Sequence, residues 1–131
     1  IYLDVFDHFL TVPWTMVTVE ALEAMRAHLE PRGLLMANVL TPLGGPGSAF
    51  LQRLVATAEE VYGAVRIYPT DPAADPEVMQ NAILVAADED GHLPPVSGAL
   101  DVPAAGRPLT DAWAPVEFLQ GKVFAQGIRW D

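Results

Sequence analysis

A chain of 131 residues with 51% hydrophobic residues, 18% charged residues and a formal net charge of −10 is long enough for one domain with its own core. The absence of cysteine excludes disulfides, thiolate catalysis and thiolate metal sites, and the negative charge argues against nonspecific nucleic-acid binding, which depends on Lys and Arg. No apolar run approaches the roughly 18 residues of a membrane helix, so we expect a soluble, cytoplasmic protein that binds neither nucleic acid nor membrane.

Periodicity predicts strands and helices that alternate along the first two thirds of the chain. Strands are indicated by β-branched, aromatic and leucine side chains, or by apolar residues at every position where both faces are buried. Helices are indicated by apolar residues three and four apart, and Ser48 and Gly63 are the expected cap and end of the second helix. The predicted elements are strand 1–6, helix 18–29, strand 34–40, helix 48–63, strand 64–68 and strand 81–87.

The C-terminal third is expected to be mostly irregular. Residues 88–108 are rich in Pro, Gly and Ala with little periodicity. The stretch 109–119 is short and mixes apolar with polar residues. The tail, residues 121–131, is predicted to form a final strand or an edge segment.

The alternation of elements predicts an α/β fold with a mostly parallel sheet and right-handed crossovers. Strands 64–68 and 81–87 have no helical pattern between them, so they are predicted to pair antiparallel through the 69–80 loop. Strand 34–40 is apolar on both faces apart from Asn38, so helices are expected on each side of the sheet. With three or four strands, one edge should lack its neighbour. We expect residues 1–131 to be a single α/β domain, the C-terminal part of a larger one, with missing N-terminal sequence or a second copy on that edge.

Two acidic residues, Asp4 and Asp7, lie at the end of the first predicted strand. In open α/β sheets, ligands bind beyond the carboxyl ends of the strands. A carboxylate there can hold a cationic amine or accept its proton during attack on an electrophile. The overall negative charge would suit a cationic substrate. The alternatives are that the two acids are surface-turn or helix-entry residues, and that the charge is that of an ordinary acidic surface.

Two stretches at opposite ends of the chain resemble the spermidine synthase-like family. The first combines that family's Asp-x-x-Asp strand end, Thr-x-x-x-Leu helix start and Leu-x-Pro-x-Gly-x-x-x-x-Asn strand entry, here Asp4–Asp7, Thr18–Leu22 and Leu29–Asn38. The second, Leu109–Glu117, is similar to the Leu-Thr-Asp-Asp-x-Ala-Pro-Val-Glu segment of bacterial members. Together the stretches span nearly the whole chain.

The resemblance implies the C-terminal half of a Rossmann-like, class I methyltransferase-type fold. It implies a polyamine aminopropyltransferase that moves an aminopropyl group from decarboxylated S-adenosylmethionine to a diamine such as putrescine. Asp4 would be the base that deprotonates the attacking amine, and Asp7 would bind the amine. The family's glycine-rich loop and ribose-binding acid lie upstream of this strand end, so the residues that bind the co-substrate are not assigned. We expect no tightly bound cofactor and no metal, and activity in the full-length protein rather than in this chain alone.

Three further residues are candidates for the substrate side of such a site. His8 stands beside Asp7, where the family has proline. Trp113 is either a substrate-stacking aromatic or an anchor of the core or of a lid. Glu117 is either a carboxylate at the site's edge or a residue that fixes the C-terminal segment by hydrogen bonds.

Two other functions are compatible with the same residues. One is an S-adenosylmethionine-dependent methyltransferase of the same fold. The other is a catalytically inactive relative that acts as an interaction module, which His8 in place of proline and the lack of the glycine-rich nucleotide loop in these residues favour.

Overall fold

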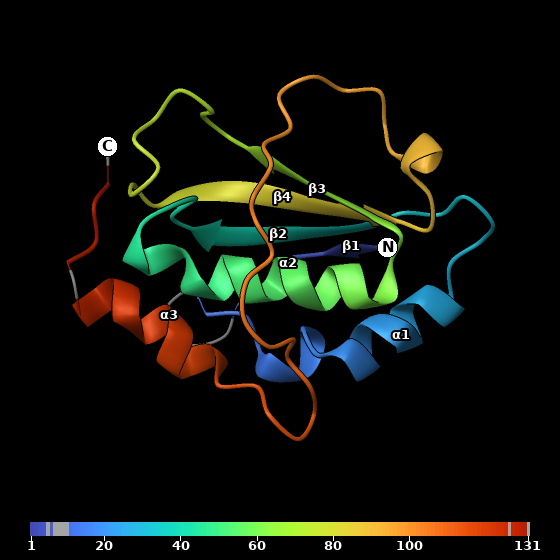
Figure 1. Ribbon diagram of the computed structural model, residues 1–131, viewed down its shortest axis with the longest axis horizontal. Coiled ribbons are helices and arrows are strands. Elements are labelled where there is room, and N and C mark those ends of the chain that lie inside the picture. The colour runs from blue at the N-terminus through green and yellow to red at the C-terminus, as the bar shows by residue number, and fades with distance from the viewer. Residues whose placement is uncertain (5, 7–10, 126, 131) are drawn as a thin grey trace.

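The computed structural model describes the whole chain except residues 5, 7–10, 126 and 131 (Figure 1). Short 3-10 turns, η2 (Trp14–Met16), η3 (Pro46–Ser48) and η4 (Asp90–His92), accompany the longer elements. In chain order, those longer elements are β1 (Tyr2–Leu3), α1 (Val19–Ala27), β2 (Leu35–Thr41), α2 (Ala49–Val61), β3 (Ala64–Pro69), β4 (Gln80–Ala87) and α3 (Val116–Ala125).

The four strands form one mixed sheet in the order β1-β2-β4-β3, which confirms the α/β fold. β1 pairs parallel to β2, whereas β4 pairs antiparallel to both β2 and β3. β1, β2 and β3 therefore run in one direction, and only β4 runs against them. The predicted antiparallel pair of the last two strands is confirmed. The insertion of β4 between β2 and β3 means, however, that only one neighbouring pair in the sheet is parallel.

The core lies between the sheet and the helices. Figure 1 shows the three helices on the same side of the sheet. The sheet residues that face them alternate along each strand, as the pleat requires. Leu35, Ala37 and Val39 of β2 belong to the same buried cluster as Phe50 and Leu51 of α2.

The opposite face of the sheet differs from the prediction, because none of the described helices covers it. Its side chains, and a segment that follows η4, form an open apolar groove lined by Met36, Tyr68, Ile83, Val85, Pro94 and Val96. The prediction that both faces of β2 are covered by helices was wrong for this face, where Met36 is 36% exposed. The apolar side chains of the strand could not indicate which elements cover each face, since that depends on connections outside the strand.

β1 is an edge strand, as the small number of strands predicted. In the described part of the chain it pairs only with β2, and Tyr2 and the preceding Ile1 are 58% and 47% exposed. The other edge strand, β3, has a bridge from Ile67 to Leu100. That a second copy or further sequence covers the β1 edge stays a prediction.

The ends of α2 differ from the prediction, whereas α1 has a regular N-terminal cap. Thr18 caps α1, since its hydroxyl accepts a hydrogen bond from the Ala21 amide at 3.2 Å. Ser48 does precede α2, but its hydroxyl donates to the Gly45 carbonyl at 2.8 Å instead of capping the helix. Gly63 has no positive φ, so it does not end α2 as a left-handed cap.

For residues 121–125 the prediction of a final strand or an edge segment was wrong, because residues 116–125 form helix α3. Beyond the helix, the Arg129 carbonyl accepts a hydrogen bond from the Met79 amide at 2.9 Å. The buried side chains of α3 recur at helical spacing: Val116, Leu119, Gln120 and Val123. Gly121 in the middle of this pattern lowers helix propensity and obscured the periodicity. No helix in the described ranges is long and apolar enough to cross a bilayer.

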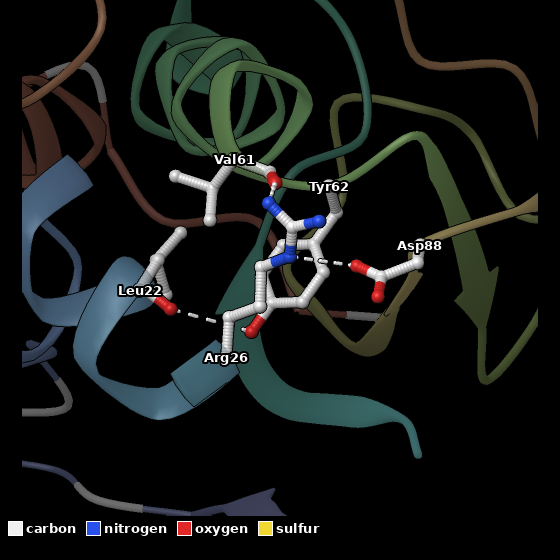
Figure 2. A network of polar contacts seen from close by, with 5 residues as sticks. All are labelled: Leu22, Arg26, Val61, Tyr62 and Asp88. Carbon is white, nitrogen blue, oxygen red and sulfur yellow. Dashed lines mark hydrogen bonds and ion pairs between the residues drawn. The ribbon is translucent and has the colours of Figure 1, made fainter. Parts of the chain in front are cut away.

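A polar network joins the C-terminal ends of α1 and α2 to the end of β4 (Figure 2). The Arg26 guanidinium donates to the Asp88 carboxylate at 2.7 Å and to the Val61 carbonyl at 3.0 Å. The Tyr62 hydroxyl donates to the Leu22 carbonyl at 3.4 Å. The Tyr62 ring is buried beneath this network, which packs α1 against α2.

The Tyr62 phenol is expected to make the stability of the fold decrease at alkaline pH. Burial, only partly opposed by the Arg26 charge, raises its pKa from 10.0 to about 12. The raised pKa means that the folded state keeps the proton while the unfolded state loses it, so stability is complete below pH 10 and falls as pH rises through 12. We expect the free energy of unfolding to fall by about 1.4 kcal/mol between pH 9 and pH 11 through this group. Urea unfolding at the two pH values measures the fall, and Tyr62→Phe should lack it, with Tyr68→Phe as the matched control. An equal fall in the Tyr62→Phe protein would contradict the assignment.

Candidate active site

Asp4 directly follows β1, at the carboxyl end of the sheet's one parallel strand pair. The register pairs Leu3 with Ala37, which places Asp4 next to Asn38 of β2. The Asp4 side chain is exposed. This is the position at which open α/β sheets bind ligands, so the structure places the predicted base where a substrate can reach it.

Asp4 is the end of a row of polar side chains that crosses three strands. The Asn38 amide nitrogen donates to Oδ1 of Asp4 at 3.0 Å, and the Asn81 amide nitrogen donates to Oδ1 of Asn38 at 2.9 Å. Asn38 and Asn81 alternate with residues that face the helices, so the row lies on the open face of the sheet, beside Met36 and Ile83. An exposed carboxylate with one oxygen held by a side-chain amide is suited to bind a cation or accept a proton.

Tyr2 approaches the second oxygen of the carboxylate. Its hydroxyl lies 3.4 Å from Oδ2 of Asp4, a long contact that a ligand could displace. Desolvation, and after it the charge and the hydrogen bond of Asp4, raise the pKa of the Tyr2 phenol. The phenol therefore remains a donor toward Asp4 at neutral pH.

Two of the predicted site residues, Asp7 and His8, lie outside the described residues. Their roles as amine ligand and site-lining residue stay predictions. Phe6, between Asp4 and Asp7, is described and is exposed.

Trp113 makes its contacts on the helical side of the sheet. The Arg53 and Arg107 guanidinium carbons each lie 5.0 Å from the centre of its ring, within the range of a cation–π contact. The half-buried ring also packs against the main core. These contacts account for Trp113 as an anchor of the segment before α3 and involve none of the polar partners of Asp4. A role in substrate binding stays a prediction.

Glu117 and Asp111 flank that segment differently. Glu117 is exposed in the first turn of α3. Asp111 accepts a hydrogen bond from the Thr18 hydroxyl at 2.7 Å, and its amide donates to Glu20 at 3.0 Å. Asp111 therefore fixes the C-terminal segment to the start of α1, whereas the role of Glu117 at a site edge is untested. In the described part of the chain, no group of three or more acidic or histidine side chains could hold a metal ion.

The two asparagines of the row were not predicted as site residues. Asn38 was visible as the polar exception in an apolar strand. Asn81 had no comparable signal, because it stands at the start of its strand, where polar residues are common. Only the register of β2 against β4 brings the two side chains together.

Comparison with solved structures identifies a similar fold in a longer protein. The crystal structure of a probable spermidine synthase from Corynebacterium glutamicum ATCC 13032 superimposes with a TM-score of 0.57, at 22% sequence identity, over 99% of this chain and 45% of that chain. No protein-family model matches the chain, and no curated protein matches it. The chain thus has the fold of a region that makes up less than half of the solved protein.

Proposed function

We propose that this chain belongs to a transferase that moves an aminopropyl group from decarboxylated S-adenosylmethionine to a diamine such as putrescine. The observation that supports the proposal most directly is the position of Asp4. It is an exposed carboxylate at the carboxyl end of β1, held on one oxygen by Asn38, in a fold similar to that of a probable spermidine synthase. A fold by itself does not determine a reaction, so the proposal depends on this site.

In the proposed reaction, Asp4 binds and deprotonates the attacking amine. The amine nitrogen forms a bond to the methylene carbon beside the sulfonium, and the carbon–sulfur bond breaks with its electron pair going to sulfur. The sulfonium becomes a neutral thioether, and the proton released by the amine goes to the Asp4 carboxylate. The carboxylate also stabilises the cationic amine before transfer, and the net charge of −10 favours the approach of a dication.

The other predicted residues complete the proposed substrate side. Asp7 would bind the amine, since two carboxylates three residues apart in the sequence could hold one ammonium together. His8 and Glu117 are proposed as further contacts of the amine. The predicted contact with Trp113 is not carried into the proposal, because two arginine side chains already lie against its ring on the helical side of the sheet. We assign no residue of this chain to the nucleoside part of the co-substrate.

Product analysis tests this proposal against its alternatives. The complete gene product is incubated with putrescine and either decarboxylated S-adenosylmethionine or S-adenosylmethionine, and the amine product is identified by mass. We expect an aminopropyl addition with the decarboxylated co-substrate. A methyl addition would instead identify a methyltransferase of the same fold. No product, together with no calorimetric binding of either co-substrate, would favour an inactive interaction module.

A further inference from the structure

The orientation of the Asn38 carboxamide determines whether its NH₂ or its oxygen faces the Asp4 carboxylate. A carboxamide presents an acceptor oxygen on one side and a donor NH₂ on the other, and either side can face a given neighbour. If the oxygen of Asn38 faced Asp4, two acceptors would oppose each other. The NH₂ faces Asp4 here, at 3.0 Å from Oδ1. The Asp4 carboxylate favours this orientation by itself, and a constraint on the amide oxygen reinforces it.

Asn81 supplies that constraint from the next strand. Its own NH₂ donates to Oδ1 of Asn38 at 2.9 Å, which requires the Asn38 oxygen to point away from Asp4. The Asn81 main chain is itself anchored, because its carbonyl accepts hydrogen bonds from the Thr70 amide at 2.9 Å and the Thr70 hydroxyl at 2.8 Å. Asn38 and Asn81 are the only two asparagines in the sequence.

We infer that Asn81 is a positioning residue that acts on Asp4 through Asn38. This inference rests on the proposed function and adds two residues to it. Asn81 fixes the Asn38 amide, and Asn38 holds Oδ1 of Asp4 by a charge-assisted hydrogen bond. The carboxylate is thereby kept in one rotamer, and Oδ2 receives the proton of the substrate amine once the amine displaces the long Tyr2 contact at 3.4 Å. Neither asparagine needs to touch the substrate for this role.

Because the hydrogen bonds among Asp4, Asn38 and Asn81 lie near the surface, we expect them to orient the Asp4 carboxylate more than they stabilise the fold. Asp4 and Asn81 are exposed and Asn38 is half-buried, so water can replace each hydrogen bond at little cost in folding free energy. Orientation of a base is more sensitive, because a misplacement of about 1 Å can cost about a hundredfold in rate.

The test removes the constraint on the Asn38 amide without changing Asp4. Asn81→Asp replaces the donor with a carboxylate, which repels the Asn38 oxygen and competes with Asp4 for the Asn38 NH₂. Asn81→Leu removes the donor without adding charge. The matched control is Gln80→Glu, which makes the same change of charge one residue away, where the Gln80 side chain bonds Asp71 in the loop after β3.

Two measurements are made on each variant. The first is the ¹⁵N-resolved side-chain amide signal of Asn38, which we expect to shift and to exchange faster with solvent in both Asn81 variants and to stay unchanged in Gln80→Glu. The second is steady-state aminopropyl transfer, in which we expect kcat to fall about ten- to a hundredfold in Asn81→Asp with little change in KM for the diamine.

The two measurements separate the possible failures. An unchanged Asn38 signal in both Asn81 variants would overturn the positioning role, whatever the activity. Shifted signals with an unchanged kcat would overturn it as well, because the orientation would then not matter to the reaction. If the wild-type protein transfers no aminopropyl group while the Asn38 signal responds as expected, the proposed function is wrong. The hydrogen-bond constraint that Asn81 places on Asn38, and through it on Asp4, is then still supported.

Discussion

Asp4→Asn is expected to lower the rate of aminopropyl transfer by about 10² to 10⁴-fold in the complete gene product, the range for removal of a general base. Asparagine has nearly the same shape as aspartate but cannot accept the amine proton, and it carries no charge to stabilise the cation. Because Asp4 is exposed, the substitution should leave the fold intact. Initial rates at saturating co-substrate, measured across diamine concentrations, give the effect on kcat and KM separately.

A second acid-to-amide substitution controls for the loss of one negative charge. Asp101 is exposed in the irregular segment before α3, and Asp101→Asn should leave the rate near that of the wild type. Thermal unfolding of both variants checks that neither is destabilised. Normal transfer by the Asp4→Asn protein would show that Asp4 is not the base.

Gly63→Ala is expected to destabilise the fold by about 3 kcal/mol, at the upper end of the range for an overpacked site. A β-carbon on residue 63 would lie 2.1 Å from the carbonyl oxygen of Asp88, so the main chain after β4 would have to move. That movement would also disturb the ion pair between Asp88 and Arg26 in Figure 2. The cost comes from lack of space, since Gly63 has no positive φ.

Gly91 provides the matched control for this substitution. A β-carbon there would meet no atom within 4 Å, and Gly91 also lacks a positive φ. Gly91→Ala should therefore be neutral or stabilising by about 0.4 to 1 kcal/mol, through a smaller entropy of the unfolded chain. Urea unfolding of both variants measures the difference, and equal destabilisation at the two positions would show that close packing against Asp88 is not the cause.

Local patterns were sufficient to predict most of the individual elements. β2 and β4 were predicted as strands from their apolar residues at successive positions, but the face away from the helices is only partly buried. α2 has a continuous stripe of buried residues from Phe50 to Val61 at helical spacing. α3 was missed because Gly121 and the polar Gln120 interrupt a shorter stripe, although Gln120 is buried and its side-chain oxygen accepts a hydrogen bond from the Val12 amide.

Local sequence patterns could not predict the order of the strands or the asparagine half of the site. Asp4 was predicted because a strand end followed by an acid is visible in a short stretch of sequence. The hydrogen bond from Asn81 to Asn38 joins residues 43 apart in sequence, and it depends on which strand lies beside β2 and in which register. Nothing in residues 34–40 or 81–87 specifies that pairing by itself.

The insertion of β4 between β2 and β3 also has a consequence for the order in which the chain can fold during synthesis. When the chain has emerged only as far as Pro69, β1 and β2 can pair, but β3 has no strand beside it, because its sheet neighbour β4 begins at Gln80. Its other described bridge, to Leu100, comes later still. The inner strand β4, which lies between β2 and β3, is therefore the last of the four to be made. Until it arrives, the nascent protein carries two separate β segments with unpaired edges, and a nascent-chain protease assay should find protection only after β4 has left the ribosome.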